Sequence, residues 1–316
     1  MKIAIIRLSS FGDVIFTAYA ISDIRQKYPE ATINFYVDPI YYELAKLNSL
    51  VTQVVSVEFM GHEKPHKSRI KELWSFARNE RRQKYDFVID TQGMYKSVLV
   101  SRILRTKRRI GLPRNRSEGL AFLFGGESKE LRSPSQVGPR LQIAWALGIE
   151  IDARRLVSGY EYLRHGMQTS PHKTAILAAY GSSPRKYLPE SVVNTIIKFL
   201  KQRGYEIILI WGSKAEHNCA ITLGAKVPGV TIPDLALSVG QLANLMASSE
   251  LFIGTDTGPT HLAMAIGVPA FVLFGPTSAS SYFYHKGTSV ALEGVDSKYA
   301  ECKLIESRLA QWLTSV

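Results

Sequence analysis

Short apolar runs alternate along the chain with segments whose apolar residues recur every three to four positions. This alternation is typical of βα units, which assemble into parallel sheets. In the first half we predict strands at residues 3–6, 33–37, 51–57 and 87–90. The helices predicted between and after these strands span residues 14–27, 41–47, 69–82, 97–104 and 137–147.

The second half repeats the scheme after a polar, irregular stretch at residues 158–172. We predict strands at residues 174–180, 207–211, 251–254 and 270–274, and helices at residues 189–202, 214–225, 239–246 and 257–266. A chain of 316 residues is longer than a single core usually supports. We therefore predict an α/β protein of two Rossmann-like, parallel-sheet domains, residues 1–160 and 161–316.

The last predicted helix carries one apolar stripe, which consists of Cys302, Ile305, Leu309, Trp312 and Val316. The sequence does not identify the surface that this stripe covers. A return of this helix onto the N-terminal domain is one arrangement that we consider.

Composition narrows the class of protein and its compartment. Hydrophobic residues make up 46% of the chain and charged residues 21%, which is globular rather than disordered usage. The two cysteines cannot form a disulfide framework, so we expect free thiols in a reducing cytoplasm.

The sequence shows no segment typical of membrane targeting or insertion. Arg7 interrupts the first apolar run, and prolines and glycines break the uncharged stretch 257–285. We therefore expect neither a signal peptide nor a membrane-spanning helix.

The net charge of +12 is concentrated in one segment. Residues 64–116 hold 16 basic and four acidic residues, so the rest of the chain sums to zero. Such a segment is typical of proteins that meet nucleic acid or another anionic surface, although about half of it could be an ordinary solvated helix face. A nucleic-acid-binding protein is disfavoured because the sequence holds no recognisable binding module.

The first candidate motif, R-L-S-S-F-G-D at residues 7–13, follows the first strand and opens a helix. A dinucleotide-binding turn would need G-x-G-x-x-G, and only Gly12 is present, which argues against a nicotinamide or flavin enzyme. Asp13 lies where the open end of a parallel sheet places ligands. It could be a catalytic acid or base, or simply the N-cap of the helix.

The second motif, G-T-D-T-G-P-T-H at residues 254–261, joins a strand to a helix. Small residues there let backbone amides at the helix N-terminus face an anion, as in a diphosphate cradle. His261 lies about one turn along from Thr257 and could reach the same anion. The alternative is an ordinary capped helix, with Asp256 or Thr257 as the cap and Pro259 in its first turn.

Two loops of the second half could complete an anion site. In residues 180–190, Gly181 and two serines can expose amides and Lys186 offers an ammonium for phosphate, but a solvated basic loop has the same pattern. At the end of the next strand, Trp211 and Gly212 could accept a nucleobase. Trp211 could equally be an ordinary core residue.

Taken together, these motifs resemble the lipopolysaccharide heptosyltransferases, inverting glycosyltransferases of family 9 with the GT-B fold. Residues 9–13 are similar to the S-S-x-G-D opening of heptosyltransferase I, which adds the first heptose. Residues 90–93 resemble the family's D-x-Q-G, residues 186–190 its K-x-W-P-E, and residues 256–261 its D-T/S-G-x-x-H signature. The chain departs from the pattern at Leu188, in place of tryptophan, and at Pro259, where leucine is frequent.

The resemblance implies an active site in the cleft between the two domains, with ADP-heptose as donor, Kdo-lipid A as acceptor and no cofactor or obligatory metal. Asp13 would be the general base, and Lys186 would neutralise the departing diphosphate. Donor binding would involve Ser182, Ser183, Lys186, Trp211, Gly212, Asp256, Thr257, Gly258 and His261. Acceptor binding would involve Ser10, Gly12, Lys64, Lys67, Arg69, Gln92 and Arg140. Alternatives are heptosyltransferase II and another GT-B enzyme with a different nucleotide sugar.

The resemblance also implies a function for the basic segment at residues 64–116. A cytoplasmic enzyme on the inner membrane of a Gram-negative bacterium would need positive charge for its phosphorylated acceptor and for anionic lipid, at about 1 kcal/mol per basic residue near the surface. We therefore expect peripheral association with the cytoplasmic face of that membrane and no nucleic-acid partner. Trp74, Phe76 and residues 122–124 could add shallow insertion.

Overall fold

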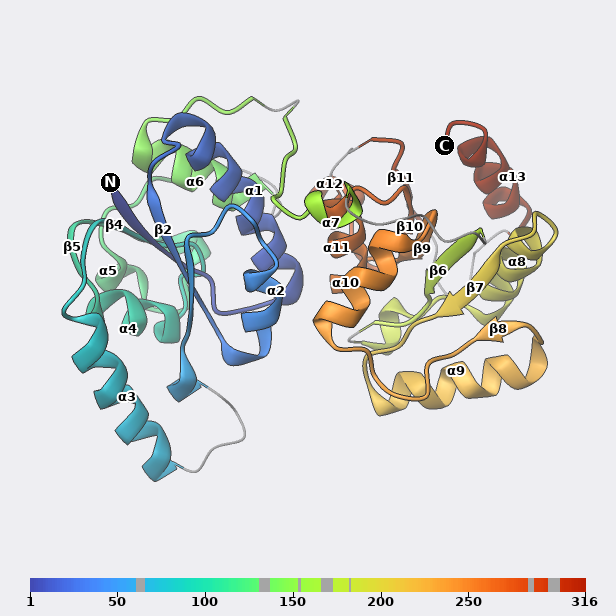
Figure 1. Ribbon diagram of the computed structural model, residues 1–316, viewed down its shortest axis with the longest axis horizontal. Coiled ribbons are helices and arrows are strands. Elements are labelled where there is room, and N and C mark those ends of the chain that lie inside the picture. The colour runs from blue at the N-terminus through green and yellow to red at the C-terminus, as the bar shows by residue number, and fades with distance from the viewer. Residues whose placement is uncertain are drawn as a thin grey trace. The chain divides into compact units, whose positions relative to one another are not determined.

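The chain divides into two compact units, Met1–Tyr160 and Glu161–Val316, in the computed structural model (Figure 1). The structure describes residues 1–60, 66–130, 137–152, 155–165, 173–181, 183–283, 287–294 and 302–316, without the side chains of residues 60 and 66–69. Each unit is an α/β fold around one wholly parallel sheet, as the sequence pattern predicts.

The sheet of the first unit has the strand order β3-β2-β1-β4-β5. Its strands are β1 (Lys2–Ile6), β2 (Thr32–Val37), β3 (Gln53–Ser56), β4 (Lys84–Asp90) and β5 (Arg105–Ile110). Its helices are α1 (Phe11–Lys27), α2 (Tyr42–Lys46), α3 (His66–Glu80), α4 (Tyr95–Ile103), α5 (Phe122–Gly125) and α6 (Gly138–Leu147). The order reverses between β1 and β4, where Ile6 pairs with Asp90, so the loops after these strands form the position at which open α/β sheets bind ligands.

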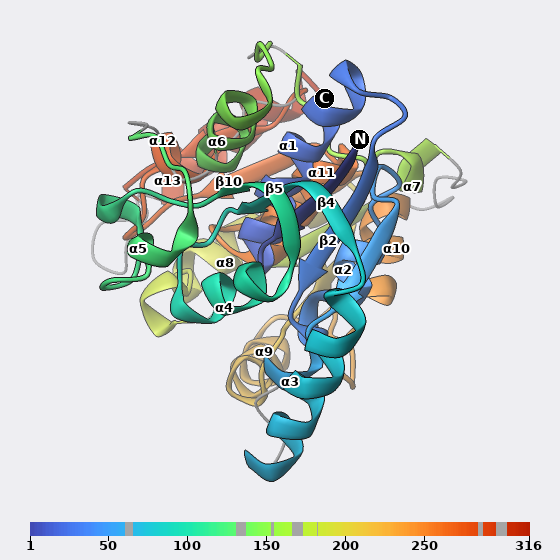
Figure 2. The ribbon, with the colours of Figure 1, turned by 90° about the vertical axis from the view of Figure 1, so that its left-hand side faces the viewer.

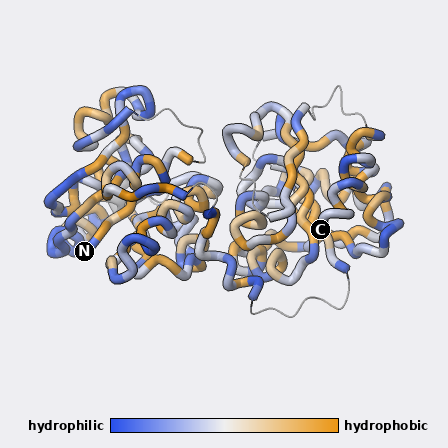
Figure 3. The backbone as a smooth tube through the Cα atoms, turned by 90° about the horizontal axis from the view of Figure 1, so that it is seen from above, coloured by the Kyte–Doolittle hydropathy of each residue, from blue (hydrophilic) through white to orange (hydrophobic). Residues whose placement is uncertain are grey.

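Helices cover both faces of this sheet (Figure 2). Side chains of α3 and α4 pack with Ala4, Ile6 and Val88 of the central strands, while α1 packs with α6. Helix α1 is buried throughout residues 14–24, because its apolar run meets protein on more than one side. The apolar strands run orange through the middle of each unit in Figure 3.

The sheet of the second unit has the order β11-β10-β9-β6-β7-β8. Its strands are β6 (Thr174–Ala178), β7 (Glu206–Leu209), β8 (Val230–Thr231), β9 (Leu251–Thr255), β10 (Ala270–Leu273) and β11 (Val290–Leu292). Its helices are α7 (Tyr162–His165), α8 (Glu190–Lys201), α9 (Lys214–Lys226), α10 (Val239–Ser248), α11 (Gly258–Ile266), α12 (Ala279–Tyr282) and α13 (Cys302–Leu313). Helix α11 ends as predicted, with Gly267 in the left-handed region at φ 91°.

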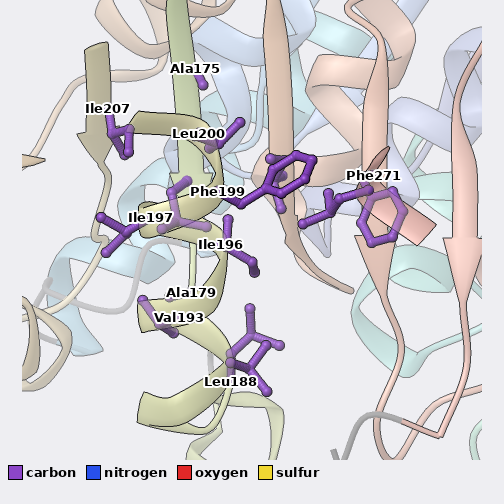
Figure 4. Packing of buried hydrophobic residues seen from close by; sticks show 14 of the residues in the cluster. Ala175, Ala179, Leu188, Val193, Ile196, Ile197, Phe199, Leu200, Ile207 and Phe271 are labelled. Atoms are coloured by element: carbon purple, nitrogen blue, oxygen red, sulfur yellow. The ribbon is translucent and has the colours of Figure 1, made fainter. Parts of the chain in front are cut away.

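The C-terminal helix α13 packs its apolar stripe on the second unit, to which it belongs. Ile305, Leu309 and Trp312 of α13 are buried in one cluster with α8 and the sheet, and the Trp312 ring lies 5.4 Å from that of Phe271. Figure 4 shows the α8 side of this cluster, where Ile196 and Phe199 point toward the strands. The apolar stripe therefore completes the core of the second unit.

Candidate functional site

In the first unit, the loop after β1 holds Asp13 in a network of donors. Arg7 Nη2 lies 2.6 Å from Asp13 Oδ2, and the same oxygen accepts hydrogen bonds from the Ser10 N–H at 3.1 Å and from the Ser10 Oγ at 2.9 Å. The Asp13 side chain is 28% exposed. Its second oxygen, Oδ1, takes no hydrogen bond from any residue that the structure describes. One oxygen is thus fixed while the other can accept a proton.

The alternative of Asp13 as an N-cap does not fit the helix. Ser10 is the N-cap of α1, which begins at Phe11, and Asp13 is the third helical residue. From there its carboxylate reaches back to the Ser10 N–H, the arm of a capping box that satisfies an exposed donor. The same carboxylate lies near the positive end of the helix dipole. Asp13 can therefore make the capping contact with Oδ2 and still offer Oδ1 as a proton acceptor.

Gln92 positions this loop through both ends of its amide. Its Oε1 accepts the Leu8 N–H at 2.8 Å, and its Nε2 donates to Ser9 Oγ at 2.9 Å. Asp90, fully buried at the end of β4, accepts the Gln92 and Gly93 N–H groups at 2.8 and 3.2 Å. Burial raises the pKa of Asp90, and these hydrogen bonds oppose it. Gln92, a candidate for acceptor binding, thus holds the loop that leads to Ser10 and to the start of α1.

In the second unit, the predicted residues Lys186, Asp256 and His261 meet although 75 positions separate the first from the last. Lys186 Nζ donates to Asp256 Oδ2 and to the Asp256 carbonyl, both at 2.9 Å, and His261 Nε2 lies 3.2 Å from Asp256 Oδ1. Burial would raise the pKa of Asp256, but His261 and then Lys186 outweigh it and lower the pKa to about 2. Asp256 is therefore an anion that fixes the side chains of Lys186 and His261.

The amino end of α11 lies against the loop that carries Lys186. A Cβ atom on Gly181 would lie 2.7 Å from Thr257 Cγ2 and 3.4 Å from Lys186 Cβ, so only glycine permits this approach. Thr257 is the N-cap, and no side chain caps the helix, while Pro259 has no N–H to offer. Thr260 Oγ1 donates to the Thr255 carbonyl at 2.5 Å. Lys186 and the first amides of α11 are thus brought together, which suits an anionic group.

Other residues predicted to bind the sugar donor make hydrogen bonds within the second unit. Trp211 donates its Nε1–H to the Pro233 carbonyl at 2.7 Å, and His217 stacks on its ring at 4.2 Å. The Gly212 N–H donates to Glu216 Oε2 at 2.7 Å. Ser183 accepts the Arg185 N–H with its hydroxyl at 3.4 Å, and Ser182 lies outside the described residues.

Arg140 does not lie at the surface, and this corrects its assignment to acceptor binding. Its guanidinium is 3% exposed and forms two hydrogen bonds to Asp23, at 2.7 and 2.8 Å. Further bonds reach the carbonyls of Asp152 and Arg155. The residue ties α6 to α1 and to the segment after α6. Sequence could not show this, because Asp23 lies 117 positions away.

The other acceptor candidates are only partly described. Gly12 lies in the first turn of α1, between Ser10 and Asp13. Lys64 lies outside the described residues, and Lys67 and Arg69 lie on α3 with side chains that are not described. Phe76, considered for membrane insertion, packs against Phe59 and Tyr36 with ring centroids 5.3 and 6.2 Å apart, while Trp74 is 72% exposed.

Sequence reasoning missed Arg7 and Tyr41. Arg7 interrupts an apolar run at the end of β1, and a charge there signals a role at the sheet's open end. It also donates to the carbonyls of Ser9 and Thr91. Burial, followed by the charges of Asp38 and Asp13, raises the pKa of Tyr41.

Among the residues that the structure describes, no group of three or more His, Cys, Asp or Glu side chains could hold a metal ion. No helix in the same part of the chain has both the length and the apolar composition needed to cross a membrane.

The family model for glycosyltransferase family 9 (heptosyltransferase) matches residues 73–308, about three quarters of the chain. The chain belongs to glycosyltransferase family 9. It is 27% identical to lipopolysaccharide heptosyltransferase 1 of Pseudomonas aeruginosa over 88% of this chain and 79% of that protein. It is 29% identical to lipopolysaccharide heptosyltransferase 1 of Campylobacter coli over 88% of this chain and 84% of that protein.

Solved structures of this family share the fold. Escherichia coli heptosyltransferase WaaC with ADP superposes with a TM-score of 0.86 at 21% identity, over 99% of this chain and all of that one. The same enzyme with ADP-2-deoxy-2-fluoro heptose gives 0.84 at 22% identity, over 98% and 99%. The prediction of two parallel-sheet α/β domains of GT-B type is confirmed. The family also confirms the prediction of a glycosyltransferase.

Proposed function

We propose that this family 9 glycosyltransferase transfers a heptose, with inversion, from ADP-heptose to the Kdo-lipid A inner core of lipopolysaccharide. Relatives named lipopolysaccharide heptosyltransferase 1 support this reaction, and the solved relative with an ADP-heptose analogue supports the donor. The first-heptose acceptor is favoured because residues 9–13 read S-S-F-G-D. The observation that carries the chemistry is the Asp13 carboxylate, with Oδ2 bound by Arg7 and Ser10 and Oδ1 open to a substrate hydroxyl.

Asp13 would act as the general base. Its Oδ1 takes the proton of an acceptor hydroxyl while that oxygen forms a bond to the anomeric carbon of the donor heptose. The bond from this carbon to the diphosphate oxygen breaks on the opposite side, and ADP leaves with the electron pair. A single carboxylate suffices, because the diphosphate is a good leaving group without prior protonation.

The second unit would hold the diphosphate. Lys186 has three N–H donors, and its bonds to Asp256 account for two of them. The third is available to a phosphate oxygen, since the Lys186 side chain is 25% exposed. The amide of Gly258 and the dipole of α11 add positive potential at the same place. Asp256, with its pKa at about 2, keeps Lys186 and His261 in position throughout the neutral pH range.

The acceptor explains the concentrated positive charge. Kdo-lipid A carries phosphates and carboxylates, and the excess of 12 positive charges lies in residues 64–116 of the first unit. The enzyme would associate with the cytoplasmic face of the inner membrane of a Gram-negative bacterium without a spanning helix, because each basic residue near an anionic bilayer contributes about 1 kcal/mol.

The test is a transfer assay with defined donors and acceptors. The protein is incubated with ADP-heptose and either Kdo-lipid A or the same acceptor already carrying one heptose, and the glycolipid is analysed by mass spectrometry. We expect a mass increase of one heptose on Kdo-lipid A alone. Extension of only the heptosylated acceptor would reassign the enzyme to the second heptose, and transfer only from another nucleotide sugar would refute ADP-heptose as donor.

A further inference from the structure

Five large apolar side chains are exposed on one part of the first unit, formed by α4 and the segment that leads through α5. Tyr95 and Leu99 of α4 are 51% and 43% exposed. Leu120, Leu123 and Phe124 are 57%, 58% and 53% exposed. We call these five residues the α4–α5 face. Monomeric proteins rarely leave so many large apolar side chains together in water unless they serve an interaction.

Hydrogen bonds join the two parts into one surface. The Leu120 N–H donates to the Tyr95 hydroxyl at 2.9 Å, and Arg102 Nε donates to the Phe124 carbonyl at 2.6 Å. Tyr95, Leu99 and Arg102 are spaced by four and three residues, so they share one side of α4. Helices α4 and α5 lie side by side in both Figure 1 and Figure 2. The five apolar side chains therefore lie on two neighbouring segments that hydrogen bonds join near both ends of α4.

Positive charge surrounds this apolar patch. Residues 95–130 include nine basic and three acidic residues. Arg102 is exposed at the end of the apolar stripe of α4, and exposed Arg114 lies over the Phe122 ring at 5.9 Å from its centroid. The neighbouring edge strand β5 adds exposed Arg105, Lys107 and Arg108. An apolar centre with a basic rim is the arrangement that suits a surface with an apolar interior and anionic headgroups.

We propose that the α4–α5 face docks on an anionic lipid bilayer, with Leu123 and Phe124 entering the headgroup region and Arg102 and Arg114 meeting lipid phosphates. A nucleic acid would satisfy the cations but leave the apolar side chains in water. A second copy of the chain would bring like charges together. The inference rests on the proposed function in one respect, since a lipid-anchored acceptor gives the enzyme a reason to dock.

The first test needs no catalysis. Sedimentation with vesicles of phosphatidylcholine, with and without phosphatidylglycerol, measures partitioning of the parent protein and of the Leu123→Ser/Phe124→Ser variant. We expect the parent to bind the anionic vesicles and the variant to bind them roughly ten-fold less, because two apolar side chains no longer enter the bilayer. The matched control is Ile221→Ser/Leu235→Ser, which replaces side chains 50% and 81% exposed in the second unit and should bind as the parent does.

Charge is tested in the same way. Arg114→Gln should reduce partitioning roughly five-fold, the equivalent of one basic residue at an anionic surface. Lys198→Gln, an exposed cation of α8 in the second unit, should leave it unchanged. Equal binding of Leu123→Ser/Phe124→Ser and parent, or failure of the parent to bind anionic vesicles, would overturn the proposal.

A transfer assay separates this proposal from the proposed function. On a deacylated, water-soluble acceptor, Leu123→Ser/Phe124→Ser should transfer heptose at the parent rate, while transfer to acceptor embedded in vesicles should fall with binding. If the parent transfers heptose but the variant is unaffected with both acceptors, the docking face is wrong and the function stands. If the parent binds vesicles through this face but transfers no heptose, the function is wrong and the docking face stands.

Discussion

Arg7 and Asp13 form an ion pair of 2.6 Å at the open end of the first sheet, and Arg7 also donates to the Ser9 carbonyl. The guanidinium thus fixes one oxygen of Asp13 and the backbone of the loop that carries it. Arg7 directly follows β1 and Asp13 lies in the first turn of α1, so this ion pair and the Gln92 amide fix the carboxylate relative to the end of the sheet.

Arg7→Gln should therefore lower kcat by roughly 10- to 100-fold, because a misplaced base acts from the wrong geometry. The KM for ADP-heptose should stay unchanged. Arg7→Lys should recover part of kcat, since it restores the charge without the fork of donors. Steady-state kinetics with Lys27→Gln, an exposed cation on α1, as control would check this. A change in donor KM with unchanged kcat would rule out the positioning role.

Lys186→Gln should weaken binding of ADP by roughly 10- to 100-fold, the usual effect of losing a charge-assisted hydrogen bond to phosphate. Adenosine, which has no diphosphate, should bind the variant and the parent equally. Isothermal titration with both ligands measures this. The adjacent, exposed Arg185→Gln serves as control. Equal losses for ADP and adenosine would place Lys186 away from the diphosphate.

The lowered pKa of Asp256 predicts how the free energy of unfolding depends on pH. In the folded protein its pKa of about 2 lies below the ordinary value of 3.8 for an aspartate. A lowered folded pKa contributes stability that is present above the unfolded pKa and is lost as pH falls through the folded one. Asp256→Asn should thus cost about 2 kcal/mol of unfolding free energy at pH 7, and the difference from parent should narrow below pH 4. Urea unfolding across this range that gave a constant difference would contradict the assignment.

Arg140→Gln should reduce the free energy of unfolding by about 3 to 5 kcal/mol, because it leaves Asp23 charged and buried without its partner. Asp23 is only 7% exposed in this pair. Adding Asp23→Asn should recover part of the loss. Urea denaturation measures both effects. A stable Arg140→Gln variant with a raised KM for the acceptor would restore the role that sequence assigned to it.

The strands and helices with a clear apolar period could be predicted from sequence, whereas β5 could not. Its sequence, R-T-K-R-R-I, has no apolar run, because it is an edge strand whose side chains are mostly exposed or half-buried. Helix α1 begins at Phe11 rather than at residue 14, since Ser10 caps it before the apolar run starts.

In the candidate site, too, the sequence predicted some residues and not others. Motifs identified Asp13, Lys186, Asp256 and His261, and the structure brings the last three into contact. The roles of Arg7 and Gln92 depend on the pairing of β1 with β4, which joins residues more than 80 positions apart. Local sequence cannot show such a contact. Arg140 was misassigned for the same reason, because its partner Asp23 lies on another helix.

The most direct test of the account is the rate of heptose transfer to Kdo-lipid A by Asp13→Asn. Asparagine keeps the size and one carbonyl acceptor for the Ser10 N–H but cannot take a proton from the acceptor hydroxyl. We expect transfer to fall by roughly 10²- to 10⁴-fold, the usual contribution of a general base, with ADP affinity and unfolding midpoint close to those of the parent. Transfer at the parent rate would contradict the central role given to Asp13.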